Sequence, residues 1–469
     1  MNTTKFSFII LLLSLFLFGC GPDQPPVTTL ELPMDRFESE EVVVFNIEQQ
    51  IRATFTIEQD SIVLPIEQPT LLNVALGRVY NYVFVRPGDQ LSLDTISSDP
   101  LVIAPVGERS VENEFLLQLA QTVNEDTERM SFREMGKSEP DSFLIKLDQK
   151  YSASEDLVEE IQANANVSAD FKAAINNYLL SLQGYHLMNY KYVYNGSQDE
   201  LPPLPDGFYT AIEKEDLTKN TWLWFDDSRQ LVSAWHYKDI DYADFESPVG
   251  YFTALLKSAQ EAYPGTLVGD YAEYDQLTDF INFGSGLTHA EADVNAFQER
   301  VSNTYLLDRL TATVEPWLAL KPGEPAPDFL VQDREGKEIR LADLAGQRVY
   351  VDVWATWCGP CIREIPSLKA LEAELHDAGI QFVSISIDAE KDHEKWLNFI
   401  EERELGGLQL MADGAWKSDV AQSYNINGIP RFFLIDEAGK IIDANAPRPS
   451  DPTVKDILLG EGAMQTHLK

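Results

Sequence analysis

The chain has 469 residues, of which 44% are hydrophobic, and it is longer than one hydrophobic core usually serves. We therefore expect a globular protein of two or three domains. The formal net charge is −40, and most of the acidic excess falls in residues 1–320, so nucleic acid and anionic lipid surfaces are poor partners on electrostatic grounds.

The N-terminus has the pattern of a secretory signal. Residues 6–18 form an almost unbroken apolar run that is too short to make a convincing membrane span. The run ends in Leu17-Phe18-Gly19-Cys20, which resembles the lipobox of bacterial lipoproteins, where the signal is cut before a cysteine that is then lipidated. The resemblance implies a signal peptide over residues 1–19, lipidation of Cys20 and a tether over 20–29. The alternative is a plain secretory signal with an incidental cysteine.

Residues 30–105 are predicted to form a β-rich domain. Short apolar runs rich in β-branched residues alternate there with turn signals such as Arg86-Pro87-Gly88-Asp89. This pattern is typical of an antiparallel β-sandwich. The runs cover residues 42–45, 53–57, 62–64 and 80–85.

Residues 106–320 change to helical periodicity, which predicts a mainly α-helical domain. Ser152 with Glu155, and Thr288 with Glu291, have capping-box spacing, so we expect helices to begin near both. The aromatic run at residues 222–225 could line a groove for a partner, but buried core is the more common use of such residues.

A Pro-rich break at residues 321–327 marks the last domain, 321–469. Strands and helices alternate after it, which predicts an α/β thioredoxin fold with its active site at the end of the first buried strand. The expected strands are 348–354, 380–387, 431–435 and one from Lys440, and the expected helices are 358–376 and 391–404. The fold class is thus a multidomain chain in which an all-β domain and a helical region precede a thioredoxin domain.

Two of the three cysteines of the chain stand at positions 358 and 361. Two intervening residues let the first turn of a helix bring both sulfurs within bonding reach, so the spacing predicts a reversible dithiol. Gly359 leaves space for a substrate, and Pro360 is tolerated in a first helical turn. A zinc site needs more ligands, and haem attachment needs a histidine where Ile362 stands, so we expect no metal and no cofactor.

Residues 351–361 resemble the active-site strand and turn of thioredoxins, and residues 364–368 continue as in the TlpA/ResA-like envelope branch. Residues 323–329 are similar to the opening of the AhpC/TSA and redoxin superfamily. The resemblance covers about a third of the chain and implies a thiol-disulfide oxidoreductase.

The resemblance also implies roles for single residues. Cys358 is expected to be the exposed nucleophile, its pKa lowered by the helix terminus, and Cys361 the less exposed resolving thiol. Asp352 matches a buried carboxylate whose pKa desolvation would raise, so that it can take the proton of Cys361. Glu364 matches an acidic residue of the TlpA/ResA branch and is expected to tune the pKa values of the cysteines.

Together with Gly359 and Pro360, three further residues, Trp357, Ile429 and Pro430, are expected to bind substrate. Trp357 offers a flat apolar surface beside Cys358, although plain packing explains it equally well. Gly428-Ile429-Pro430 matches the loop that faces the dithiol in thioredoxins, so we expect Pro430 to be cis and the Ile429 backbone to meet an extended substrate.

These features predict an enzyme that reduces disulfides of envelope proteins from a lipid anchor on the periplasm-facing side of a membrane. The resemblance suggests apocytochrome c as a client and a membrane electron donor for re-reduction. Two alternatives stay open at this point. One is a binding or assembly lipoprotein in which residues 21–320 do the main work, and the other is a thiol peroxidase, suggested by residues 326–329.

Overall fold

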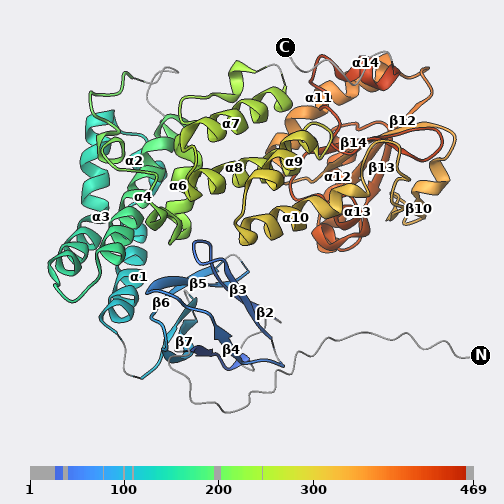
Figure 1. Ribbon diagram of the computed structural model, residues 1–469. Coiled ribbons are helices and arrows are strands. Elements are labelled where there is room, and N and C mark those ends of the chain that lie inside the picture. Colours follow the sequence, from blue (N-terminus) through green and yellow to red (C-terminus); the bar gives the residue numbers. More distant parts are fainter. Residues whose placement is uncertain are drawn as a thin grey trace, which may run out of the picture.

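The computed structural model describes residues 27–460, apart from 35–40, 57, 78, 99–100, 108–109, 195–201 and 246. Figure 1 shows strands in the N-terminal part, a band of helices, and a sheet with helices in the C-terminal part. The predicted signal peptide, Cys20 and residues 20–26 of the predicted tether lie outside the described residues.

The N-terminal region consists of two sheets, with the strand orders β4-β1-β7-β8 and β3-β2-β5-β6 in the described residues. In β4, burial alternates along the strand, so Ile62 and Leu64 face the core while Val63 is exposed. Pairing is antiparallel as predicted, except that β1 runs parallel to β7. Alternation within a strand sets which face is buried, but it does not set the direction of a distant partner. The strands are β1 (Thr28–Glu31), β2 (Glu41–Asn46), β3 (Ile51–Thr56), β4 (Ser61–Leu64), β5 (Thr70–Leu76), β6 (Val79–Val85), β7 (Gln90–Ser98) and β8 (Leu101–Pro105).

The middle region is helical, as predicted. The predicted helix start near Ser152 is wrong, because the buried stripe of Leu147, Tyr151 and Val158 carries one helix through this position. The Ser152 hydroxyl instead donates to the carbonyl of Gln149 at 3.2 Å. The elements are α1 (Val111–Arg129), α2 (Phe132–Met135), α3 (Pro140–Ala163), α4 (Ala169–Val193), α5 (Thr210–Glu213), η2 (Asn220–Leu223), α6 (Asp226–Trp235), η3 (Tyr242–Asp244), α7 (Pro248–Ala262), α8 (Leu267–Asp279), the π-helix η4 (Phe280–Ser285), α9 (Glu291–Arg300) and α10 (Thr304–Leu318).

The sandwich and the helices are joined through buried polar contacts. The Asn73 side chain donates to the carbonyl of Trp224 at 3.0 Å and accepts from the Arg229 guanidinium at 3.0 Å. Trp222 and Phe225 are each 1% exposed, so the aromatic run at 222–225 belongs to the core and not to a groove. Of the helices that the structure describes, none is long and apolar enough to cross a membrane.

The C-terminal region has the predicted thioredoxin-like α/β fold, with the described strands in the order β10-β9-β13-β12-β11-β14-β15. Strand β11 lies inside this sheet, parallel to β12 and antiparallel to β14, and is buried from Val349 to Trp354. Burial on both faces explains its almost continuous apolar sequence. The elements are β9 (Leu330–Gln332), β10 (Glu338–Arg340), η5 (Leu341–Leu344), β11 (Arg348–Trp354), α11 (Gly359–Glu374), β12 (Ile380–Ser386), η6 (Glu390–Asp392), α12 (His393–Glu402), β13 (Leu408–Met411), η7 (Ala415–Lys417), α13 (Asp419–Ser423), β14 (Arg431–Ile435), β15 (Ile441–Asp443) and α14 (Val454–Leu459).

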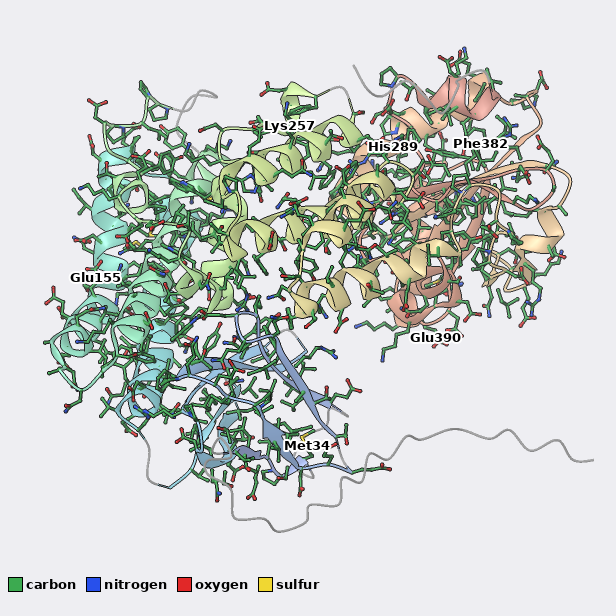
Figure 2. All side chains as sticks on the ribbon, in the orientation of Figure 1. Met34, Glu155, Lys257, His289, Phe382 and Glu390 are labelled. Atoms are coloured by element: carbon green, nitrogen blue, oxygen red, sulfur yellow. A yellow bond between two sulfur atoms is a disulfide. The ribbon has the colours of Figure 1, made fainter. Side chains whose placement is uncertain are left out.

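The helical region also packs against the C-terminal region. Arg431, at the start of β14, is 3% exposed, donates to the carbonyl of Asn282 in η4, and lies 5.5 Å from the ring centroid of Trp317 in α10. His289 lies at this boundary (Figure 2), where residues of both regions line a cavity. Because one buried cluster runs from Phe45 to Ala444 and includes residues of all three regions, these regions share a continuous core.

Candidate active site

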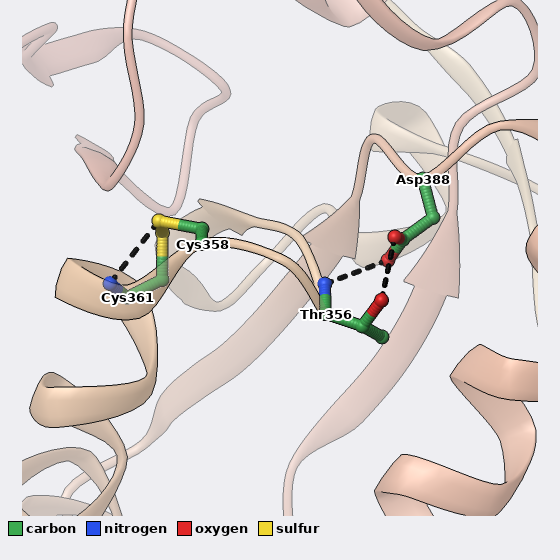
Figure 3. Close-up of a disulfide and its surroundings, with 4 residues drawn as sticks. All are labelled: Thr356, Cys358, Cys361 and Asp388. Atoms are coloured by element: carbon green, nitrogen blue, oxygen red, sulfur yellow. Dashed lines mark hydrogen bonds between the residues drawn. A yellow bond between two sulfur atoms is a disulfide. The ribbon is translucent and has the colours of Figure 1, made fainter. Parts of the chain in front are cut away.

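The two cysteines lie where the turn after β11 enters α11, and they form a disulfide with Cα atoms 5.3 Å apart. Cys358 is the N-cap of α11, and the backbone N–H of Cys361 donates to its Sγ at 3.2 Å (Figure 3). An amide at a helix N-terminus stabilises negative charge on that sulfur. The site therefore favours the thiolate of Cys358 once the disulfide is reduced.

The predicted difference in exposure between the cysteines is wrong for this oxidised form. Cys358 and Cys361 are each 4% exposed. In the disulfide, the Cys358 sulfur lies over the first turn of α11, where it accepts from the Cys361 N–H. What distinguishes the two is their position in the helix, because Cys358 caps α11 while Cys361 lines a cavity beneath it.

Asp352 lies in that cavity, which has a volume of about 10 Å³. Burial is the main cause that raises the pKa of the Asp352 carboxyl to about 8, and the negative charges of Glu364 and Glu372 act in the same direction. The direction agrees with the prediction. A carboxyl group with this pKa exchanges its proton near neutral pH, which suits an acid and base that serves the neighbouring Cys361.

The same cavity contains groups that sequence reasoning missed. Glu372 lines it, and burial raises the pKa of its carboxyl. Trp354 and Gln409 also line the cavity. The Trp354 Nε1 and Gln409 Oε1 atoms are both buried without a hydrogen-bond partner. A donor and an acceptor beside a space of this size fit one bound water. The signal for Glu372 was its helical spacing, since residues 361, 365, 368 and 372 share one face of α11.

Glu364 follows Cys361 by one turn of α11, and a different element holds its carboxylate. The backbone N–H and the hydroxyl of Ser450 donate to it at 3.0 and 2.9 Å. Glu364 thus ties α11 to the turn before α14, while its charge raises the pKa of Asp352. Its predicted effect on the cysteines stays a prediction.

The rim of the site is open. Trp357 is 52% exposed, and its ring centroid lies 6.4 Å from that of Trp416 in η7, which sequence reasoning missed because it lies far along the chain. A Cβ atom placed on Gly359 would meet only Arg363 Nη1, at 3.8 Å, and Pro360 is exposed in the first turn. A substrate can approach the dithiol from this side.

The Ile429–Pro430 peptide bond is cis, as predicted. Strand β14 starts at Arg431, which pairs with Val353 near the end of β11. Since the two strands are antiparallel, the loop before β14 and the turn after β11 emerge at the same edge of the sheet. The sequence-predicted contacts Trp357, Gly359, Pro360, Ile429 and Pro430 thus gather at one edge, and their roles in binding stay predictions.

A buried clamp that the sequence did not reveal holds the active-site turn. Asp388, just beyond β12, accepts from the Thr356 backbone N–H at 2.9 Å and from its hydroxyl at 2.8 Å (Figure 3). The Ser386 hydroxyl donates to the same carboxylate at 2.7 Å. Asp388 is therefore a positioning residue, and its only signal was the alternation of polar residues with isoleucine over residues 384–388, at the end of a buried strand.

Comparison with known proteins assigns this region to a family. Residues 322–444 match the AhpC/TSA family. The thiol-disulfide oxidoreductase ResA of Bacillus cereus is 33% identical over 121 residues, which cover 26% of this chain and 67% of the relative. ResA of Geobacillus thermodenitrificans is 33% identical over 123 residues, covering 26% and 68%. The matched segment is thus about a quarter of this chain and two thirds of each relative.

Among solved structures, a crystal structure of a putative thiol-disulfide oxidoreductase from Bacteroides vulgatus is 37% identical and covers 31% of this chain and 99% of its own, with a TM-score of 0.28. The same family is indicated by the dithiol at the first turn of α11, by the thioredoxin-like sheet and by the ResA relatives. The chain belongs to the ResA-like thiol-disulfide oxidoreductases of the thioredoxin superfamily.

Proposed function

We propose that this oxidoreductase reduces disulfides of envelope proteins while a lipid on Cys20 anchors it to a membrane. The observation that carries the chemistry is the Cys358–Cys361 pair. Cys361 lines the same small cavity as the buried Asp352 carboxyl. The signal-like residues 1–19 support the place of action.

The reaction has two exchange steps. The Cys358 thiolate attacks one sulfur of a client disulfide, forms a mixed disulfide, and releases the other client sulfur as a thiolate that takes up a proton. The Cys361 thiolate then attacks Cys358 Sγ, closes the internal disulfide and releases the second client thiol. Two electrons and two protons pass from the enzyme dithiol to the client disulfide.

Asp352 supports the second step. Its carboxylate takes the proton of the Cys361 thiol as that sulfur attacks, and its protonated form returns the proton when the enzyme disulfide is opened again. With a pKa of about 8, the Asp352 carboxyl is present near neutral pH in both its protonated and its ionised form. Glu364 and Glu372 adjust this balance through their charges.

The residues between the cysteines favour a reductant over an oxidant. Gly359 and Pro360 are the pair found in reducing thioredoxins, whose potentials lie near about −270 mV, whereas strong oxidants lie near about −120 mV. A membrane dithiol donor then recharges the enzyme. Apocytochrome c is a fitting client, because its haem-binding cysteines must be reduced before attachment.

Trapping tests this proposal. Cys361→Ser leaves Cys358 unable to resolve, so mixed disulfides with clients should accumulate in envelope extracts and disappear on treatment with a reductant. Cys358→Ser with Cys361→Ser is the matched control and should trap nothing. If Cys361→Ser captures no envelope protein, or the measured potential lies near −120 mV as for strong oxidants, the reducing role is wrong.

A further inference from the structure

A cavity of about 400 Å³ opens beside the Ile429–Pro430 loop, and both the helical and the C-terminal region line it. This volume is within the range of specific binding pockets. The C-terminal side supplies the loop, β14, β15 and the turn before α14. The helical side supplies the start of α7, the end of η4 and the turn before α9.

Phe283 of η4 is the prominent apolar group on the helical side. It is 48% exposed, yet its ring approaches within 3.4 Å of the position that a Cβ atom would take on Gly428, next to Ile429. A Cβ atom on Gly284 would overlap the ring of Phe280, so glycine permits the tight π-turn that presents Phe283. A half-exposed ring against a substrate loop is typical of a binding surface.

Buried contacts fix this wall in place. The Arg431 guanidinium donates to the Asn282 carbonyl, one residue before Phe283, and to Asn445 Oδ1 at 2.9 Å. Since Arg431 directly follows Pro430, the same side chain joins the π-helix to the substrate loop. Removing such a buried, bonded charge is costly, so the wall and the loop form one rigid unit.

The lining indicates which occupant fits. Its larger apolar side chains include Val249, Phe283, Ile429, Phe432, Ile442 and Ile457. Charged residues of both signs also line the cavity, among them Arg431, Arg448, Asp443 and Asp451, so the lining does not favour one sign of charge. Because the cavity adjoins the loop that is predicted to meet an extended substrate, the occupant that fits it is the client chain next to the reacting cysteine.

We propose that the helical region forms one wall of the client groove and that Phe283 selects clients with a bulky apolar side chain beside the cysteine. This inference rests on the proposed reduction of protein disulfides. It gives the region before residue 321 a direct part in client choice.

The test uses the full chain and two synthetic peptides, each with an internal disulfide, which carry Phe or Ser beside the cysteine. We expect kcat/KM of the wild type to favour the Phe peptide about tenfold, and Phe283→Ala to reduce this preference to about twofold or less. Phe283→Leu should keep most of it. Tyr192→Ala, a change at a 65% exposed aromatic on α4, is the matched control and should keep the wild-type preference.

A small disulfide, bis(2-hydroxyethyl) disulfide, separates the possible failures. If the wild type reduces it but shows no preference between the peptides, or if Phe283→Ala keeps the preference, the inference is wrong and the oxidoreductase role stands. If the wild type reduces neither the peptides nor the small disulfide, the proposed reducing function itself fails.

Discussion

The cavity beneath the dithiol and the cavity beside the Ile429–Pro430 loop differ in size, origin and chemistry. The cavity beneath the dithiol has a volume of about 10 Å³, and its lining, which includes Asp352 and Cys361, comes entirely from the C-terminal region. The cavity beside Pro430 has a volume of about 400 Å³ and takes one wall from the helical region. In the proposed mechanism, proton transfer is contained within one region, while client recognition depends on two.

The comparison predicts different outcomes for changes in the two cavities. A change beneath the dithiol should slow the reduction of every disulfide to the same extent, because each reaction needs the same proton transfers. A change at the client groove should alter the preference between clients. The ratio of the rates for the Phe and Ser peptides distinguishes the two.

The largest effect is expected for Cys358→Ser. Loss of the attacking sulfur should lower kcat/KM by about a thousandfold or more for both peptides, because no other group of the site can replace a thiolate. Quenched assays that quantify the peptide thiols formed over time measure kcat/KM. Cys20→Ser is the thiol control and should retain activity in the purified protein. Substantial turnover by the Cys358→Ser variant would show that Cys358 is not the attacking thiol.

Asp352→Asn should slow the resolution step by about ten- to a hundredfold for both peptides, because the Cys361 thiol loses its base. Rapid-quench measurement of mixed-disulfide decay against pH checks this. The wild-type rate should rise with pH through about pH 8, the pKa of Asp352, and the variant should lack this rise. A variant with an unchanged profile would exclude Asp352 as the base.

The same substitution should stabilise the fold at high pH. The unfolded Asp352 carboxyl has a pKa near about 3.9, whereas the folded one has a pKa of about 8. Between these values the unfolded state binds fewer protons, so the unfolding free energy of the wild type falls as pH rises. At pH 9, Asp352→Asn should be more stable by about 1–3 kcal/mol, and at pH 3 equally stable, as denaturant unfolding can measure.

Asp388→Ala should destabilise the protein by about 1–3 kcal/mol, since it leaves the buried N–H and hydroxyl of Thr356 unpaired. The clamped turn leads to Cys358, which the reduction of either peptide requires, so activity should fall equally for the two peptides. Thermal unfolding and kinetics measure these effects. Asp377→Ala is the matched control, because its side chain is 94% exposed. A selective loss for one peptide would contradict the assigned position of the clamp.

The smallest effect is expected for Glu372→Gln. Its negative charge raises the pKa of Asp352, so its removal should lower the midpoint of the pH profile by roughly a few tenths of a unit. The preference between the peptides should stay as in the wild type. A midpoint that moves upward would show that Glu372 acts on Asp352 by some other route than its charge.

Much of the fold could be predicted from the sequence. The predicted limits of β11 and β14 agree with the structure because long buried strands have continuous apolar sequences. Strands β9, β10 and β13 were missed, since three or four residues carry too little periodicity. The helix expected near Ser152 failed because a capping pattern is weaker evidence than an unbroken buried stripe.

The sequence by itself determined the reactive pair Cys358 and Cys361, the place of Asp352 on the buried strand and the cis proline at 430, because these depend on spacing within one turn, strand or loop. Tertiary structure alone decided the clamp from Asp388 to Thr356, the covering of Cys358, and the link between Arg431 and Asn282, which lie 149 residues apart. Such contacts form only when separate elements pack together, and the spacing of residues along one chain does not specify which distant surfaces will meet.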